Sequence, residues 1–195
     1  MILYLVTTNS NKLKEINDIS PSKFEIKSIY EIVPQSDVEE NGDTFLQNAI
    51  KKVEAYKEQS VFLLSDDSGL EIDCMNGFPG VKSARYLENA SYKEKMESII
   101  DMLKNSNDRS ARFRCLAVFY DPFKSNYFAS EGSVNGTISN NIRGSKGFGY
   151  DPIFIPDGYD GTFGELGDDV KSKISHRVKA FKKLFSLIDL FYGQK

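Results

Sequence analysis

Two adjacent carboxylates, Asp66 and Asp67, stand directly after the apolar run 61–64. That run predicts a buried strand, and polar groups at the carboxyl end of such a strand lie where open α/β sheets bind ligands. Neighbouring acids repel each other unless a cation or donor compensates them, and alternation along a strand would send them to opposite faces. The pattern indicates a metal or phosphate site, although a solvated D-D-S-G turn explains the same residues.

A lysine near the start of a predicted helix indicates an anion site. The polar loop 7–12 links an apolar strand to residues 13–19, whose apolar positions recur at helical spacing. Asn9 or Ser10 would cap this helix, and its free backbone N–H groups together with Lys12 favour a phosphate. The loop contains no glycine, so it is neither a Walker A loop nor a dinucleotide fingerprint. A capped surface helix with a solvated lysine is the alternative.

A second helix is predicted from Thr44 to about residue 59. Thr44, Asn48 and Lys52 recur every four residues, so they share one face of this helix. The two acids 39–40 precede the helix, and the polar row would lie next to them. These acids are either part of a site or a complement to the helix dipole.

The glycine-rich segment 143–156 combines aromatic residues with a carboxylate. Phe148 and Tyr150 offer aromatic faces beside the carboxylate of Asp151, and this combination suits a heterocyclic base that is stacked and then hydrogen-bonded at its edge. A hairpin in which Phe148 fills the core is the alternative. Further on, the apolar spacing predicts a long C-terminal helix with His176 and Arg177 near its N-terminus.

The remaining segments predict scaffold. A capping box at Ser91 and Glu94 begins a helix with an apolar face, and 111–120 and 127–138 read as an antiparallel pair of strands. No linker, repeat or low-complexity segment divides the chain. We therefore expect one domain over residues 1–195.

Composition limits the classes of function. The 195 residues are 40% apolar and 27% charged with a net charge of −3, so no global field attracts nucleic acid or an anionic membrane, and no apolar run approaches the ~20 residues of a membrane span. The first residues lack the basic segment and cleavage site of a secretion leader and read as a strand. Two cysteines, Cys74 and Cys115, are too few for a disulfide framework. We expect a cytoplasmic protein that binds neither nucleic acid nor membrane.

The only histidine of the sequence, His176, makes a zinc enzyme of the common types unexpected, because no cluster of histidine ligands can form. A serine hydrolase is equally unexpected, because no G-x-S-x-G elbow is present. A divalent metal would be held by oxygen, which favours magnesium or manganese.

Taken together, the motifs closely resemble the inosine triphosphate pyrophosphatase family from residue 3 to about residue 185. The segments that carry the resemblance, in chain order, are T-T-N-S-N-K (7–12), E-E-N-G-D-T-F-L-Q-N-A (39–49), S-D-D-S-G-L (65–70), G-F-P-G-V-K-S-A-R-Y (77–86), G-F-G-Y-D-P-I-F (147–154) and K-S-K-I-S-H-R (171–177).

The resemblance implies a two-lobed α/β fold with a long mixed central sheet flanked by helices and an active-site cleft between the lobes. It also implies a cytoplasmic homodimer that uses magnesium to hydrolyse ITP, dITP and XTP. The products are the nucleoside monophosphate and pyrophosphate, and the reaction keeps these purines out of DNA and RNA.

Residue by residue, the resemblance makes Asp67 the proton acceptor and, with Glu40, a metal ligand, supported by Asp66. The positions that match substrate-binding residues are Thr7, Thr8, Asn9, Ser10, Asn11, Lys12, Lys52, Ser68, Phe148, Gly149, Tyr150, Asp151, Lys171, His176 and Arg177. The first six and Lys52 match the phosphate side, and the last three match residues that close over the purine.

Departures from the family pattern are Thr8, where glycine is frequent, Gln47, where glutamate is frequent, and Gly164, where alanine is frequent. Two other functions stay open. One is a related pyrophosphatase for modified pyrimidine or 7-methylated nucleotides, which would not need the S-H-R segment. The other is a catalytically silent nucleotide-binding protein, which the intact acid pair argues against.

Overall fold

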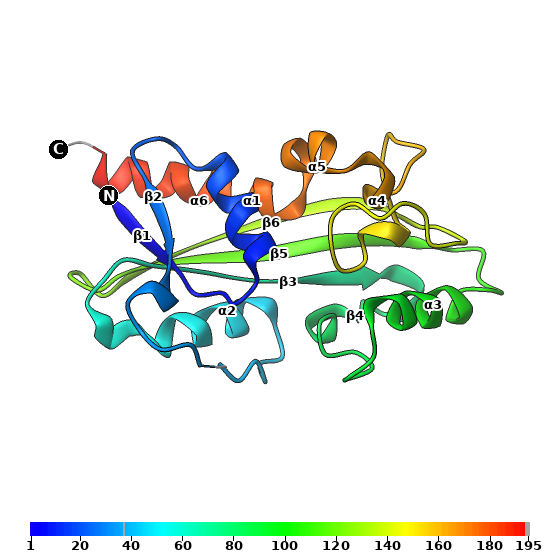
Figure 1. The fold of residues 1–195 in the computed structure, drawn as a ribbon, viewed down its shortest axis with the longest axis horizontal. Helices are drawn as coiled ribbons and strands as arrows, with labels where there is room; N and C mark the ends of the chain where they lie inside the picture. The colour runs from blue at the N-terminus through cyan, green and yellow to red at the C-terminus, as the bar shows by residue number, and fades with distance from the viewer. Residues whose placement is uncertain (37, 194–195) are drawn as a thin grey trace. The chain divides into compact units, whose positions relative to one another are not determined.

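The computed structural model describes residues 1–36 and 38–193. Helices and strands alternate along much of the chain (Figure 1). The α-helices are α1 (Ser10–Ile19), α2 (Phe45–Glu54), α3 (Tyr92–Met102), α4 (Phe163–Leu166), α5 (Asp168–Ile174) and α6 (His176–Tyr192). The strands are β1 (Ile2–Leu5), β2 (Glu25–Ser28), β3 (Leu63–Ile72), β4 (Phe78–Pro79), β5 (Ser110–Asp121), β6 (Asn126–Ile138) and β7 (Phe154–Pro156).

The strands form a mixed sheet in the order β2-β1-β3-β5-β6-β7, with β4 paired to β3. β1 runs parallel to both β2 and β3, whereas β4 is antiparallel to β3 and β7 is antiparallel to β6. β5 and β6 are neighbours joined by the short turn 122–125, which is the predicted hairpin. The predicted α/β class with a mixed central sheet flanked by helices is confirmed.

The chain divides into two compact units. Unit 1 consists of Met1–Asp67, Cys115–Gly132 and His176–Lys195, and unit 2 consists of Ser68–Arg114 and Ser133–Ser175. The long strands β3, β5 and β6 contribute residues to both units. Each unit has a hydrophobic core of its own.

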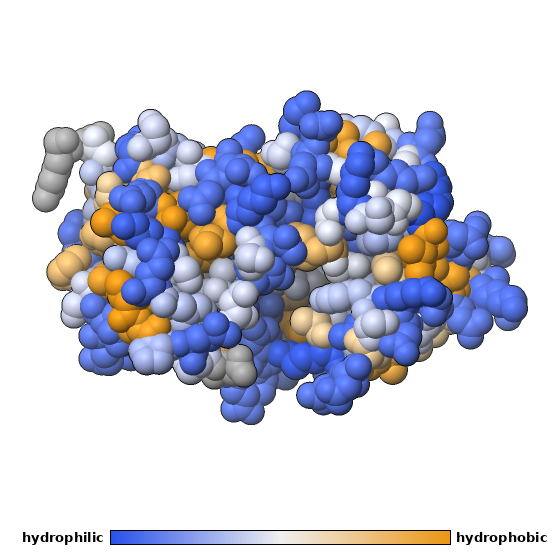
Figure 2. Space-filling model, in the orientation of Figure 1, coloured by the Kyte–Doolittle hydropathy of each residue, from blue (hydrophilic) through white to orange (hydrophobic). Residues whose placement is uncertain are grey.

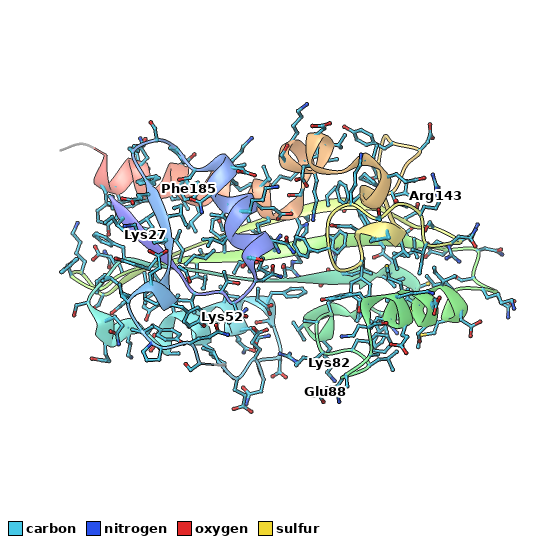
Figure 3. All side chains as sticks on the ribbon, in the orientation of Figure 1. Lys27, Lys52, Lys82, Glu88, Arg143 and Phe185 are labelled. Atoms are coloured by element: carbon cyan, nitrogen blue, oxygen red, sulfur yellow. The ribbon has the colours of Figure 1, made fainter. Side chains whose placement is uncertain are left out.

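Helices cover both faces of the strands in unit 1. Figure 1 shows α1 and α6 on one side of these strands and α2 on the other. Because neighbouring strand residues point to opposite faces, Leu64 belongs to the core formed with Phe181 and Phe185 of α6, whereas Leu63 belongs to the core formed with Val53 of α2. Phe185 is labelled in Figure 3. The same alternation decides where the next polar residues of β3 point.

The core of unit 2 is rich in aromatic rings. Phe113 of β5 lies with its ring centroid 4.6 Å from that of Phe154 of β7, and the ring of Phe163 of α4 lies 5.6 Å from that of Phe154. Ile99 of α3 is part of the same cluster. The predicted capping box at the start of α3 is present. This packing holds α3 and α4 to the strands of unit 2.

One prediction about β3 is wrong. The strand was expected to end at residue 64 with the two acids in a loop, but it runs from Leu63 to Ile72 and carries Asp66 and Asp67 in its middle. Turn-forming residues are tolerated in this strand because Lys12 and Arg177 compensate the charge of Asp66, and Asn48 of α2 donates a hydrogen bond to Asp67. The alternative of a solvated D-D-S-G turn is therefore excluded, because these residues lie within the strand.

The end of α2 also differs from the prediction. The helix was expected to reach about residue 59 but ends at Glu54, followed by the short 3-10 helix Lys57–Gln59. Tyr56 has φ −127° and a buried ring that packs edge-on against Tyr30 at 6.0 Å, and Ser60 adopts a left-handed conformation. Burying this ring turns the chain out of the helix.

The face of the molecule in Figure 2 is mostly hydrophilic, with apolar residues in scattered patches. No helix in the described part of the chain is both long enough and apolar enough to span a membrane.

Candidate active site

Asp66 is the centre of a buried ion cluster in unit 1. Its Oδ2 accepts hydrogen bonds from Lys12 Nζ at 2.9 Å and Arg177 Nε at 3.3 Å, and the thiol of Cys115 lies 3.8 Å away. Burial alone would raise the pKa of Asp66, but the charges of Lys12, Arg177 and Lys52 outweigh burial and hold the pKa well below its usual range. Asp66 therefore stays ionised and holds two cations in place.

Asp67 faces the opposite side of β3 and has the opposite electrostatics. Its Oδ2 accepts a hydrogen bond from Asn48 Nδ2 of α2 at 2.9 Å, and its Oδ1 lies 3.9 Å from Lys52 Nζ. Burial raises the pKa of Asp67 above its ordinary value, and the nearby lysine charges do not fully offset that rise. The prediction that the two acids point to opposite faces is confirmed. A carboxylate whose pKa is raised is suited to accepting a proton.

Lys52 of α2, labelled in Figure 3, joins these groups. Its Nζ donates to the backbone carbonyl of Asp66 at 2.9 Å and lies 2.7 Å from Glu40 Oε1. Burial would lower the pKa of Lys52, but the charges of Asp67, Glu40 and Asp66 raise it above its ordinary value. Lys52 is therefore a fixed positive charge beside three acids.

Glu40 and Asp67 fit a magnesium ion in their chemistry. Both carboxylates lie close to the ammonium group of Lys52, so the negative charges of this pair stabilise a positive charge beside them. Among the described residues, no three His, Cys, Asp or Glu side chains group closely enough to hold a metal. Magnesium is often bound by one or two carboxylates together with substrate phosphates, and the donor types of this pair match that chemistry.

The predicted phosphate loop begins at Thr7 and ends in α1. Asn9 is the cap of α1, because its Oδ1 accepts from the backbone N–H groups of Asn11 at 2.9 Å and Lys12 at 3.3 Å. Thr7 Oγ1 in turn accepts from the N–H of Asn9 at 3.2 Å. The side chains of Thr8, Ser10 and Asn11 are exposed. The predicted cap is confirmed, and the loop presents polar groups to solvent beside Lys12.

Arg177, at the start of α6, belongs to the same unit. Its side chain is 2% exposed and lies between Asp66 and Glu15 of α1, whose Oε2 accepts from Nη1. Burial would lower the pKa of Arg177, but the charges of Asp66 and Glu15 raise it. His176 is also buried, at the first position of α6. The guanidinium group and the ammonium group of Lys12 thus share one carboxylate oxygen, Oδ2 of Asp66.

A second group of predicted residues lies in unit 2. Lys171 Nζ is 2.6 Å from Asp151 Oδ2 and 4.0 Å from the ring centroid of Phe148. The same Asp151 oxygen accepts from the backbone N–H of Phe148 at 2.8 Å. Gly147, with φ +73°, allows this approach, because a Cβ there would lie 2.1 Å from Asp151 Oδ2. The cluster therefore combines an aromatic ring, a cation and a carboxylate.

Three further predicted residues lie in unit 2. Tyr150 is buried with its hydroxyl donating to the carbonyl of Ser83 at 2.9 Å, so its ring supports the segment from inside the core. Gly149 has φ +65°, and Ser68 of β3 is partly exposed.

Sequence reasoning missed three residues that contact predicted ones. Asn48 had a signal, since it recurs with Thr44 and Lys52 on one helix face. Glu15 follows Lys12 by three positions, which places both on one face of α1. Cys115 had none, because only the folded chain brings β5 to Asp66.

Comparison with known proteins gives one family. The model of the Ham1 family matches residues 3–187. The dITP/XTP pyrophosphatase of Bacillus subtilis is 43% identical over 190 residues, covering 95% of this chain and 96% of the relative. That of Dictyoglomus thermophilum is 40% identical over 195 residues, covering 97% and 95%.

Solved structures agree with these relatives. The Staphylococcus aureus Ham1 protein superposes with a TM-score of 0.88 at 36% identity and covers all of both chains. A HAM1 protein from Coxiella burnetii gives a TM-score of 0.89 at 34% identity, covering 97% of this chain and 99% of that one.

Proposed function

The chain belongs to the Ham1 family, and we propose that it hydrolyses the non-standard purine nucleoside triphosphates ITP, dITP and XTP to the monophosphate and pyrophosphate. The observation that carries the proposal is the contrast between Asp66 and Asp67. One acid is held ionised among cations, and its neighbour has a raised pKa beside a second lysine. Relatives named dITP/XTP pyrophosphatase support the substrate class.

Asp67 is proposed as the general base. It takes a proton from a water molecule, whose oxygen attacks the α-phosphorus while the bond from that phosphorus to the bridging oxygen breaks. Pyrophosphate leaves with the electron pair of that bond. Positioned acid–base catalysis of this kind contributes about two to four powers of ten in rate.

Lys12 and Lys52 are proposed to neutralise the phosphates, which carry about four negative charges near neutral pH. Asp66 keeps Lys12 beside the loop through a 2.9 Å ion pair, and the polar side chains of the loop add hydrogen bonds. The capped N-terminus of α1 adds the positive end of the helix dipole, which also attracts the phosphates.

Magnesium is the proposed cofactor, with manganese as a substitute, and Glu40 and Asp67 are its proposed ligands. When bound, the ion would polarise phosphate oxygens and lower the pKa of a bound water. Lys52 Nζ lies 2.7 Å from Glu40 Oε1 and 3.9 Å from Asp67 Oδ1, so both proposed ligands face the same point.

For base recognition, the proposal uses Phe148 as a stacking surface, with Lys171 and Asp151 supplying a donor and an acceptor. The ion pair at 2.6 Å fixes their relative position in unit 2. A donor suits the keto oxygen that hypoxanthine and xanthine carry at position 6, whereas adenine carries an amino group there. A homodimer in the cytoplasm is also proposed from the resemblance, and sedimentation analysis would test the dimer.

The deciding experiment is a panel of nucleoside triphosphates assayed for pyrophosphate release, with magnesium and with EDTA. We expect ITP, dITP and XTP to exceed ATP in kcat/KM by about a hundredfold or more. Because each 1.4 kcal/mol of activation free energy corresponds to a tenfold change in rate, this preference corresponds to about 2.8 kcal/mol. EDTA should abolish turnover and added magnesium should restore it. Preference for a modified pyrimidine or 7-methylated nucleotide would favour the related pyrophosphatase. Binding without turnover would favour the silent binder.

Replacing Lys12 with alanine is expected to lower kcat/KM for ITP and ATP by a similar factor of about ten or more, because this lysine would touch only the phosphates. The control is Lys14→Ala, an exposed lysine two positions later on α1, which should behave as wild type. Steady-state kinetics on both substrates give the measurement. A loss confined to ITP would place Lys12 at the base instead.

A further inference from the structure

We propose that Asn48 is a positioning residue for the catalytic carboxylate, and that it ties Asp67 to the loop that carries Glu40. The inference rests on the proposed function of Asp67. Asn48 lies on α2 and is fully buried, with 0% of its surface exposed.

The two ends of the Asn48 amide have different partners. Nδ2 donates to Asp67 Oδ2 at 2.9 Å, and Oδ1 accepts the backbone N–H of Gly42 at 2.8 Å. An amide nitrogen only donates and an amide oxygen only accepts, so these partners leave one orientation of the side chain. The nitrogen must face the carboxylate.

This orientation makes the two oxygens of Asp67 different. Oδ2 is held by the amide, whereas Oδ1 points toward Lys52, at 3.9 Å from Nζ. A carboxylate held at one oxygen cannot rotate without breaking that bond. Asn48 thus selects Oδ1, on the side of Lys52 and Glu40, as the oxygen that works on the substrate.

The loop before α2 approaches Asn48 too closely for a side chain. A Cβ on Gly42 would lie 2.7 Å from Asn48 Oδ1 and 2.8 Å from the Cβ of Gln47. Gly42 is two residues after Glu40, so the Asn48 amide contacts the loop that carries Glu40. The same amide contacts Asp67, the other proposed metal ligand, on β3.

Helix α2 has anchors besides Asn48. Thr44 and Gln47 form a capping box at the start of α2, and Ser65 Oγ of β3 donates to the Ala49 carbonyl at 2.7 Å. These contacts anchor α2 to its loop and to the strand independently. The Asn48 amide is therefore available for positioning.

The test is Asn48→Asp, which retains an oxygen for Gly42 and replaces the donor aimed at Asp67 with an acceptor. We expect kcat for ITP to fall by about thirtyfold or more in this variant and in Asn48→Ala, the signature of a lost transition-state interaction. In Asn48→Ala, which adds no charge beside Lys52, KM should change by less than about threefold, and affinity for tripolyphosphate, measured without metal by calorimetry, should stay near the wild-type value. Asn48→Ala is measured alongside and decides the matter if the aspartate variant does not fold.

Gln47→Glu is the matched control, because it adds the same charge one residue earlier on α2. It also retains the side-chain oxygen that accepts the backbone N–H of Thr44. It should match wild type in kcat, KM and melting temperature. Wild-type turnover in the same assay reports on the proposed function separately. The inference is overturned if a folded Asn48 variant keeps wild-type kcat, or if tripolyphosphate affinity and KM of Asn48→Ala worsen as much as its kcat does.

Discussion

Replacing Asp67 with asparagine is expected to lower kcat by about two to four powers of ten, the range that a general base contributes. Asparagine has nearly the same shape, and its amide still accepts a hydrogen bond from Asn48, but it cannot take a proton. Burial raises the pKa of Asp67, so this strand position already disfavours the charged form. The variant should therefore fold.

Kinetics with ITP, a melting curve and tripolyphosphate binding provide the measurement for Asp67→Asn. The contrasting variant is Asp66→Asn, which leaves Lys12 and Arg177 without the anion between them. Breaking such a buried pair costs about 3–5 kcal/mol, so this second variant should lose stability as well as activity. If Asp67→Asn keeps more than a tenth of wild-type turnover, the general base lies elsewhere.

The site was predictable where chemistry depends on local spacing. Asn9 could be expected to cap a helix because its side chain and the free N–H groups are neighbours in sequence. The opposite orientation of Asp66 and Asp67 also follows from strand alternation. These features need no knowledge of the rest of the fold.

Features that depend on distant segments were not predictable. β3 continues through the acid pair because Lys12 and Arg177 come from α1 and α6 to compensate Asp66. Local composition favours a turn there, and only the tertiary partners reverse that preference. Glu15 and Cys115 enter the cluster for the same reason.

For Arg177, the role that the family resemblance implies differs from the contacts that the structure shows. The resemblance implies a residue that closes over the purine, and a donor-only guanidinium would suit a 6-keto oxygen. In unit 1, however, its side chain is 2% exposed and bound to Asp66 and Glu15. Asp66 also holds Lys12, at 2.9 Å, so the guanidinium is coupled through Asp66 to a lysine proposed to bind the phosphates.

Arg177→Ala is therefore expected to lower kcat/KM for ITP and ATP by a similar factor, about tenfold or more, because it disturbs groups that serve any triphosphate. It should also lower the free energy of unfolding by about 3–5 kcal/mol, since the buried Asp66 and the partly buried Glu15 lose their shared cation. Arg177→Lys, which retains the charge but not the forked donor, should fall between wild type and alanine. The control is Lys179→Ala, which removes an exposed charge from the same helix. Parallel kinetics on the two nucleotides and denaturant unfolding decide the outcome. A loss limited to ITP, with ATP unchanged, would assign Arg177 to the base and would mean that it leaves Asp66 and Glu15 when substrate binds.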